Sequence, residues 1–304
     1  MKILIIGYGS IGKRHEEVLL NIPQITKVDI VTKQSLLNKN TFISLDEVPD
    51  MASYDYFVIA TETNKHYNQL KFLDLQVSNK IIFCEKPLFQ TSQKLDIINN
   101  EVFIGYVLRF HPLLQQLKNK LKTQQILSAN AYCGQYLPDW RPNTDYTKSY
   151  SASKSMGGGV LLDLSHEIDY LQWLCGDILE LKSYQVQISD LKIDSDDMTT
   201  FIGKTTNNIF INLSIDYISK LTQRKLLLHT TDSTYELDFI QNTLIEKSKD
   251  GLEQISKFSN LERNYMFTSM HKAILFNDSD DTCTYSQGKN VMQTITKIQE
   301  ENNV

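Results

Sequence analysis

Three glycines near the N-terminus have the spacing of a loop that binds a dinucleotide. Gly7, Gly9 and Gly12 form the pattern G-x-G-x-x-G between an apolar run, Lys2 to Ile6, and helix-compatible sequence from Ile11 to about Leu20. The first glycine of such a loop permits a tight turn, the second lets N–H groups approach a pyrophosphate, and the third lets the helix pack on the strand. Unpaired N–H groups at the helix N-terminus then face the phosphates. The predicted cofactor loop consists of Gly7, Gly9, Ser10, Ile11 and Gly12.

A second group of chemically useful side chains follows three consecutive glycines, residues 157–159. Asp163, His166 and Asp169 are spaced three apart, so on a continuous helix over about 161–175 they share one face. A histidine with its usual pKa of about 6.5 takes or gives a proton near neutrality. The glycines are expected to allow close approach of a ligand or cofactor. The alternative is that Asp163 caps the helix and His166 packs in the core.

The elements that position the glycine loop form an alternating pattern of strands and helices. Short apolar strands are predicted at Lys2–Ile6, 27–32, 54–60, 80–84 and 102–106, with a helix over 66–75 among the intervening segments. This alternation is typical of a doubly wound parallel sheet of the Rossmann type, in which ligands bind beyond the carboxyl ends of the strands. The residues expected at those ends, beside the cofactor, are Ala60, Thr61, His66, Glu85 and Lys86.

The end of the second strand bears on the choice between NAD and NADP. An Asp or Glu about 20 residues beyond the glycine loop binds the adenosine ribose of NAD. This chain has Thr32 and Lys33 there instead. A hydroxyl and a cation suit a 2′-phosphate, so NADP is favoured over NAD, with a solvated Lys33 as the alternative.

The remainder of the chain has a different pattern, with few helices between its strands. It predicts an α+β domain with a large, mainly antiparallel open sheet, one face of which serves dimerisation. A polar loop over 135–156 precedes the glycines. We therefore expect an NAD(P)-binding domain over 1–107 and a substrate-binding and oligomerisation domain over 108–304. Strands are expected at 125–134, 181–188, 198–204, 209–215, 225–230 and 233–240, and helices at 112–123, 161–175, 261–276 and 288–302.

Composition excludes several classes of partner. The net charge is −5, with no dense Lys/Arg block, which argues against nucleic acid. No apolar run reaches the roughly 18 residues that span a bilayer. The four cysteines and six histidines are scattered, which supports neither a disulfide framework nor a metal site. The expectation is a soluble, cytoplasmic protein without membrane or nucleic-acid partners.

Taken together, these motifs resemble the glucose-fructose oxidoreductase / inositol dehydrogenase / rhizopine catabolism (Gfo/Idh/MocA) family, over nearly the whole chain. The resemblance implies a Rossmann domain followed by an α/β domain with a large open sheet, and assembly into homodimers or homotetramers. The segments that carry it are Gly7–His15, Ala60-Thr61 with His66, Glu85-Lys86-Pro87, Gly105–Pro112 and Gly157–Asp169.

The resemblance also implies roles for individual residues. Lys86 matches the catalytic lysine, and Asp163 and His166 match the acidic and histidine members of the site. The usual family pattern places four steps, with a glycine, between that Asp and His, whereas here the step is three. His166 is therefore expected to be rotated or accommodated by a local bulge.

The activity implied is hydride transfer between a nicotinamide and a carbinol or carbonyl carbon of a sugar, sugar nucleotide or polyol. His166 is the natural group to move the hydroxyl proton, and Lys86 to stabilise charge on the reacting oxygen, although the two roles are exchangeable. The alternatives are a reductase of a non-sugar substrate, since the family includes biliverdin and diol reductases, and a non-catalytic dinucleotide-sensing regulator. The substrate-binding candidates are Arg109, His111, Arg141, Tyr150 and Asp163.

Overall fold

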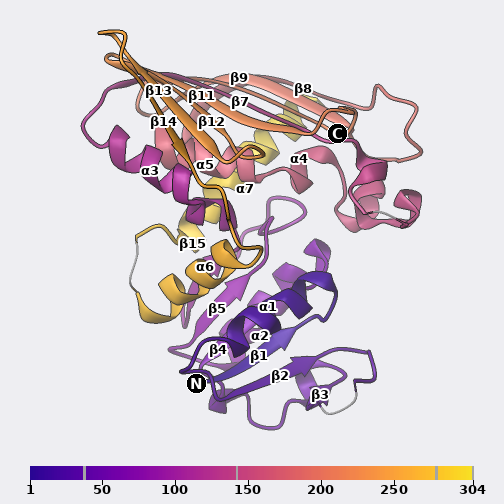
Figure 1. Cartoon of the computed structure of the whole chain (residues 1–304). Helices are drawn as coiled ribbons and strands as arrows, with labels where there is room; N and C mark the ends of the chain where they lie inside the picture. The colour runs from indigo at the N-terminus through magenta and orange to yellow at the C-terminus, as the bar shows by residue number, and fades with distance from the viewer. Residues whose placement is uncertain (37–38, 142, 278–279, 303–304) are drawn as a thin grey trace. The chain divides into compact units, whose positions relative to one another are not determined.

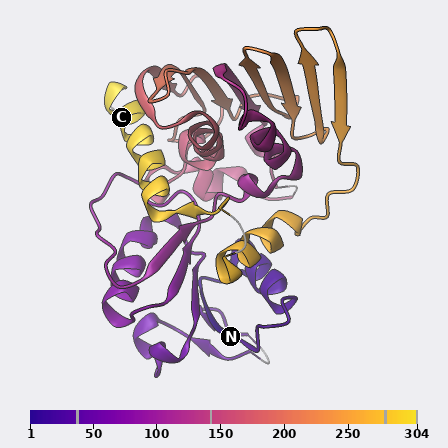
Figure 2. The same cartoon turned by 90° about the vertical axis from the view of Figure 1, so that its left-hand side faces the viewer.

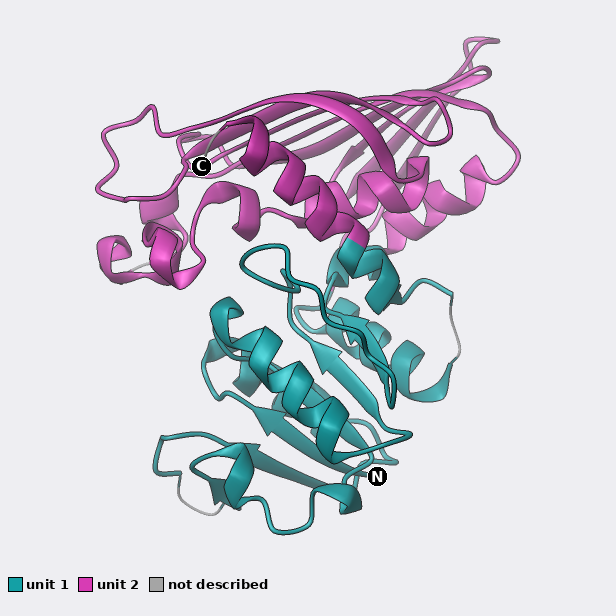
Figure 3. Cartoon of the chain, turned by 180° about the vertical axis from the view of Figure 1, so that it is seen from behind, with its two compact units in different colours: residues 1–110, 262–289 teal, residues 111–261, 290–304 magenta. Residues whose placement is uncertain are grey.

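The computed structural model describes residues 1–36, 39–141, 143–277 and 280–302, which form two compact units (Figure 3). Unit 1 consists of Met1–Phe110 and Glu262–Lys289, and unit 2 of His111–Leu261 and Asn290–Val304. The first crossing lies close to the boundary expected between residues 107 and 108. The return of 262–289 to unit 1 has no signature in the sequence, because an amphipathic helix does not reveal which of two sheets it covers.

The sheet of unit 1 has the strand order of a doubly wound dinucleotide-binding fold, as predicted. Its order is β3-β2-β1-β4-β5-β6-β15, all parallel except β15, which pairs antiparallel with β6. The central strand β1 is buried on both faces, which explains its continuous apolar run. The strands are β1 (Lys2–Ile6), β2 (Lys27–Val31), β3 (Thr41–Phe42), β4 (Tyr56–Ile59), β5 (Ile81–Cys84), β6 (Glu101–Ile104) and β15 (Cys283–Thr284).

Helices cover the sheet of unit 1 and supply much of its core. The helix α1 (Ser10–Leu20) follows the glycine loop, α2 (His66–Gln76) follows β4, and α6 (Tyr265–Phe276) comes from late in the sequence. Phe267, Met270 and Ile274 of α6 belong to the same apolar cluster as residues of α1 and the sheet. The helix α6 is therefore an integral part of unit 1.

Unit 2 is built on an eight-stranded sheet of order β14-β13-β12-β11-β7-β10-β9-β8. All neighbours are antiparallel except β7 and β10, which are parallel, so the predicted mainly antiparallel sheet is confirmed. The strands β13 and β14 lie at one end of the sheet and were not predicted, because they are short and polar, and β14 is largely exposed. The strands are β7 (Ile126–Gly134), β8 (Ile178–Val186), β9 (Met198–Thr205), β10 (Phe210–Asp216), β11 (Gln223–Thr230), β12 (Ser233–Asp238), β13 (Thr243–Ser248) and β14 (Glu253–Lys257).

The helices of unit 2 lie on one face of this sheet (Figures 1 and 2). They are α3 (Pro112–Leu121), α4 (Val160–Asp163) and α5 (His166–Cys175), while α7 (Tyr285–Glu301) begins in unit 1 and ends in unit 2. Side chains on the opposite face remain uncovered: Ile202 and Phe210 are 62% and 64% exposed. Within the ranges the structure describes, no helix combines the length and apolar character needed to cross a bilayer.

Candidate active site

The glycine loop joins β1 to α1, and its three glycines have different surroundings. A Cβ added to Gly7 would lie 2.6 Å from the carbonyl oxygen of Ala60, and one added to Gly12 would overlap the carbonyl oxygen of Gly7. A Cβ on Gly9 would meet no atom within 4 Å. The fold itself therefore requires Gly7 and Gly12, whereas Gly9 leaves the space that a pyrophosphate needs to approach the backbone.

The start of α1 also fits a dinucleotide. The N-cap of this helix is Gly9, which has no side chain to accept hydrogen bonds from the first helical N–H groups. The first turn, which begins at Ser10, carries no acidic residue, and both Gly9 and Ser10 are exposed. Such a helix start can donate N–H groups to phosphate oxygens without competition from a carboxylate.

The residues expected to choose between NAD and NADP lie directly after β2. The buried Thr32 hydroxyl accepts the N–H of Gln34 at 3.2 Å, so it shapes the turn. Lys33 is exposed. One acidic residue beside this loop, Glu16 of α1, accepts hydrogen bonds from the Tyr8 hydroxyl and the Lys39 ammonium, and this cluster was not foreseen.

The loops after β4 and β5 are joined by His66. Its ring is 1% exposed; Nε2 lies 3.2 Å from the carbonyl oxygen of Thr61, and Nδ1 lies 3.1 Å from that of Pro87. Burial lowers the pKa of His66, although hydrogen bonds to these carbonyls oppose the shift. The His66 ring thus lies between the Thr61 loop and the segment following Lys86, and as a neutral imidazole it donates its single N–H to one of these carbonyl oxygens.

Lys86 stands at the carboxyl end of β5, as predicted, next to a carboxylate that is almost fully buried. Glu85 Oε2 accepts the backbone N–H of Lys86 at 3.1 Å, and Glu85 Oε1 lies 2.9 Å from Nε2 of His15. The Lys86 side chain is half-buried, and its peptide bond with Pro87 is cis. The Glu85 carboxylate therefore holds the backbone that presents Lys86.

The helix expected over 161–175 is interrupted between the two predicted site residues. Asp163 is the last residue of α4 and His166 the first of α5, with Leu164 and Ser165 outside both helices. The expectation of one continuous helical face for Asp163, His166 and Asp169 is therefore wrong. The local irregularity expected from the three-residue spacing is present as a break in the helix.

Asp163 lies in a buried, hydrogen-bonded setting in unit 2. The Tyr217 hydroxyl donates to its carboxylate at 2.6 Å, and Asp163 is 5% exposed. Burial and the Asp163 carboxylate together raise the pKa of Tyr150, so its hydroxyl stays protonated. The exposed Arg141 guanidinium lies 5.6 Å from the centre of the Tyr150 ring. Asp163 and Tyr150 are brought together as expected, and Tyr217 is a partner that sequence patterns did not indicate.

The glycines before α4 are required by close contacts within the protein. A Cβ on Gly158 would overlap the carbonyl oxygen of Tyr150, and one on Gly159 would overlap the carboxylate of Asp196. Gly159 also has a φ of +116°, and the Asp196 carboxylate accepts the N–H of Leu161 at 2.9 Å. The expectation that these glycines admit a ligand is therefore wrong. The groups that approach Gly158 and Gly159 closely belong to the chain itself, namely the polar loop at Tyr150 and the carboxylate of Asp196.

A buried ion pair holds α5, whose first residue is His166. The Arg224 guanidinium of β11 donates to both carboxylate oxygens of Glu167, at 2.6 and 3.0 Å. Burial alone would lower the pKa of Arg224, but the adjacent Glu167 carboxylate outweighs this effect and raises the pKa above its usual value. The guanidinium therefore stays charged. Bidentate pairs of this kind fix geometry strongly. No sequence motif marks Arg224, because its partner lies 57 residues away.

Two of the expected substrate-binding residues have structural contacts instead. Arg109 is 2% exposed and donates to the carbonyl oxygen of Thr282 at 3.2 Å and to the Gln287 side chain at 2.8 Å. His111 is equally buried, with Nε2 3.0 Å from Oδ1 of Asn242. Both side chains are therefore engaged in contacts within the fold, which give no support to a substrate role. Lys86 belongs to unit 1, and Asp163 and His166 belong to unit 2.

Comparison with known families assigns both parts of the chain. Residues 1–101 match the model of an oxidoreductase family with an NAD-binding Rossmann fold. Residues 115–236 match the model of the C-terminal domain of the same Gfo/Idh/MocA group.

Individual relatives agree with these matches. Inositol 2-dehydrogenase of Salmonella typhimurium is 26% identical over 236 residues, which cover 71% of this chain and 67% of the relative. Levoglucosan dehydrogenase in complex with NADH has a similar fold, with a TM-score of 0.82 at 17% identity, covering 100% of this chain and 97% of that one. UDP-N-acetylglucosamine 3-dehydrogenase from Acidithiobacillus ferrooxidans has a TM-score of 0.77 at 18% identity, covering 99% and 97%.

Proposed function

The chain belongs to the Gfo/Idh/MocA family of NAD(P)-dependent oxidoreductases, and we propose that it acts on a carbinol or carbonyl carbon of a sugar, sugar nucleotide or polyol. The observation that carries the substrate class is the buried Asp163 carboxylate, which lies with Tyr217 and Tyr150 beside the helix break that precedes His166. Carboxylates and tyrosine hydroxyls suit a substrate with several hydroxyl groups. The relatives described above act on inositol, levoglucosan and a nucleotide sugar, according to their names.

The proposed chemistry assigns one task to each polar residue. A bound nicotinamide supplies the acceptor or donor of the hydride. In the oxidation direction, His166 removes the hydroxyl proton while the C–H electron pair leaves as hydride, and a carbonyl forms. The Lys86 ammonium donates a hydrogen bond to the oxygen and stabilises its developing negative charge. Asp163 orients the substrate hydroxyls or the His166 ring.

The experiment that tests this function begins with binding and ends with turnover. The purified protein is titrated with NADH and NADPH by nicotinamide fluorescence, and sugars and polyols are then screened for oxidation and reduction. Turnover of a polyhydroxylated substrate supports the proposal. Cofactor binding without turnover of sugars, polyols or non-sugar carbonyl compounds would favour a dinucleotide-sensing regulator. A protein that neither binds a nicotinamide cofactor nor turns over any of these substrates would overturn the enzyme assignment.

We further propose that NADP(H) is preferred, because the turn after β2 carries the exposed Lys33 cation and no acidic residue. Lys33→Glu is expected to weaken NADPH binding about tenfold, which corresponds to about 1.4 kcal/mol. The effect arises because a carboxylate repels the 2′-phosphate of NADPH. The same carboxylate can accept hydrogen bonds from the free ribose hydroxyls of NADH. Lys71→Glu, the same charge change at an exposed position of α2, is the control. Unchanged NADPH affinity in Lys33→Glu, or tighter binding of NADH by the wild type, would contradict this preference.

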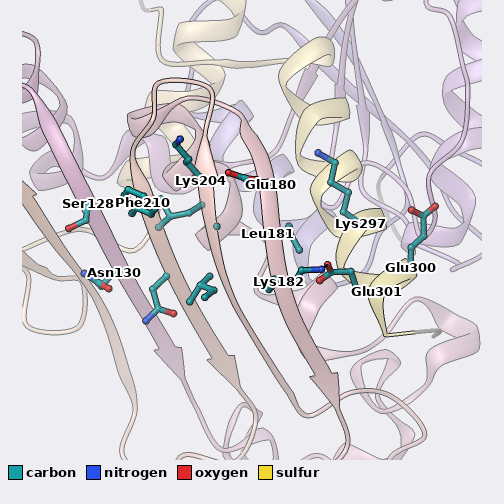
Figure 4. Close-up of a pocket in the computed structure, with 14 residues that line it drawn as sticks. Ser128, Asn130, Glu180, Leu181, Lys182, Lys204, Phe210, Lys297, Glu300 and Glu301 are labelled. Atoms are coloured by element: carbon teal, nitrogen blue, oxygen red, sulfur yellow. Dashed lines mark hydrogen bonds and ion pairs between the residues drawn. The ribbon is translucent and has the colours of Figure 1, made fainter.

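We also propose that the uncovered face of the unit 2 sheet binds a second copy of the chain. A groove of about 980 Å³ lies on it, lined by strands β7 to β10 and by the end of α7 (Figure 4). Its lining combines exposed apolar side chains, Ile202 and Phe210, with charges of both signs such as Lys204 and Glu180. A two-fold interface brings one patch against itself, so a mixed-charge surface can be self-complementary.

Charge placed in this groove is expected to dissociate the oligomer. Phe210→Glu buries an unpaired carboxylate in the interface, so light scattering after size exclusion should report a monomer where the wild type is dimeric or tetrameric. Leu75→Glu changes a side chain of α2 that is 71% exposed and does not belong to this sheet, so it should keep the assembly. A monomeric wild type, or an unaffected Phe210→Glu variant, would rule out this interface.

A further inference from the structure

Four polar side chains form a continuous hydrogen-bonded network in the interior of unit 1. His15 Nε2 lies 2.9 Å from Glu85 Oε1, His15 Nδ1 lies 2.8 Å from His271 Nε2, and His271 Nδ1 lies 2.9 Å from the Tyr56 hydroxyl. These residues come from four elements: α1, the end of β5, α6 and β4. We call Glu85, His15, His271 and Tyr56 the His15 network.

The carboxylate at one end of the network favours one direction for its hydrogen bonds. A His15 ring that donates from Nε2 to the Glu85 carboxylate and carries a single proton offers Nδ1 as an acceptor. His271 must then donate from Nε2, which leaves its Nδ1 to accept from Tyr56. Burial raises the pKa of Tyr56 well above its ordinary value and lowers that of His271 well below, so the phenol stays protonated and the imidazole neutral. Each ring therefore has one defined tautomer.

The surroundings of the network exclude water. His15, Tyr56 and His271 are each fully buried. The His15 ring packs edge-on against Phe83 at 5.0 Å and Phe267 at 5.5 Å between ring centres. Burying polar groups is costly unless they are hydrogen-bonded, and apolar side chains would fill the same space at less cost. The network is thus an expensive way to pack a core, which points to a role beyond packing.

We propose that the His15 network positions Lys86 by fixing the Glu85 carboxylate, so that His15, His271 and Tyr56 are positioning residues for the reaction. With Oε1 held by His15, Glu85 directs Oε2 to the backbone N–H of Lys86 at 3.1 Å. His15 lies on α1, the helix whose start fits the dinucleotide phosphates, so the same helix locates cofactor loop and lysine. This inference rests on the proposed role of Lys86.

The network ends inside the protein, and this feature distinguishes a positioning role from a role in conducting protons. Its last member, Tyr56, has no exposed surface. A proton passed from Glu85 along the two imidazoles would therefore have no outlet to solvent at that end. The geometry suits a fixed set of hydrogen bonds that orients a carboxylate.

Two substitutions of His271 distinguish this role from simple core packing. His271→Leu removes both hydrogen bonds and is expected to lower kcat by about 10- to 100-fold, because a small displacement of a reacting group is costly. The KM for the cofactor should change by less than about threefold, since the glycine loop is untouched. His271→Gln restores a donor and an acceptor and should recover kcat to within about threefold of the wild type. Met270→Leu, a buried change on the same helix, controls for packing.

A second measurement does not depend on turnover. Nitrogen-15 NMR of histidine-labelled protein should show ring protons on Nε2 of His15, toward Glu85, and on Nε2 of His271, toward His15, in the wild type. In His271→Leu the amide of Lys86 should exchange faster with solvent, whereas in His271→Gln it should stay protected. If no substrate is found, these spectra still test the network, so its failure is separate from failure of the proposed function.

Several outcomes would overturn the inference. They are Nδ1–H tautomers in the wild type, unchanged kcat and Lys86 amide exchange in His271→Leu, and equal losses of kcat in the leucine and glutamine variants. A general loss of folding in His271→Leu would appear as a lowered melting temperature, and the glutamine variant then decides the question.

Discussion

Replacing Lys86 by methionine is expected to lower kcat by about 10²- to 10⁴-fold, the range associated with loss of a catalytic proton donor or charge stabiliser. Methionine keeps most of the length and apolar volume of the half-buried lysine stem but removes the ammonium. Glu85 contacts the backbone N–H of residue 86, so its hydrogen bond survives the change. Affinity for NAD(P)H, measured by fluorescence, should therefore stay within about threefold.

Two further variants serve as the control and as the test of the second proposed catalytic group. Lys71→Met makes the same chemical change at an exposed position of α2 and should leave kcat unaltered. His166→Ala tests the other proposed group: its residual rate should rise with pH if His166 is the base, because hydroxide replaces the lost acceptor. If instead the Lys86 variant shows that pH dependence, the two roles are exchanged. A Lys86→Met enzyme with wild-type kcat would exclude Lys86 from the chemistry.

Substituting Gly9 by valine is expected to weaken NAD(P)H binding by at least about 100-fold without unfolding the protein. The backbone of Gly9 has φ −74° and ψ −165°, which an L-residue with a side chain can adopt. A Cβ there meets no protein atom within 4 Å, so the added bulk occupies the space assigned to the pyrophosphate. A loss of this size corresponds to about 2.8 kcal/mol of binding free energy.

The other two glycines of the loop provide the contrast. Gly12→Val would drive a side chain into the carbonyl oxygen of Gly7, and Gly7→Val would force a branched residue to φ +94° against Ala60. Both variants are expected to unfold at markedly lower temperature, because overpacking and backbone strain act on the folded state. If Gly9→Val lowers the melting temperature as much as Gly12→Val, or binds NADPH normally, the division between structural and cofactor glycines is wrong.

Local patterns predicted the N-terminal part of unit 1 well, because its strands and its glycine loop are each marked by a short stretch of sequence. The run Lys2–Ile6, the glycine spacing and the helix that follows all lie within twenty residues, and each has a physical requirement that few sequences meet. The same holds for Lys86 at the end of β5, since parallel strands place their carboxyl ends at one edge. The alternation of strands and helices likewise predicted a doubly wound parallel sheet.

Contacts between distant segments could not be predicted in this way. His271 joins His15 across 256 residues, and Arg224 joins Glu167 across 57. A single sequence does not mark such pairs. Taken alone, each histidine is compatible with ordinary core packing, and Arg224 and Glu167 are each compatible with a solvated surface charge. The family resemblance indicated a local irregularity between Asp163 and His166, but helical periodicity alone predicted one continuous helix, because Leu164 and Ser165 are compatible with a helix.

The return of residues 262–289 to unit 1 has a consequence for how the protein is made. On the ribosome, α6 is synthesised about 160 residues after the last strand of the parallel sheet, a delay of about 8 to 32 s at ordinary rates of synthesis. During that interval the nascent sheet and α1 lack Phe267, Met270 and Ile274, and His15 lacks the imidazole it contacts in the finished unit. The first third of the chain therefore completes its apolar core only after a helix from near the end of the sequence has been synthesised.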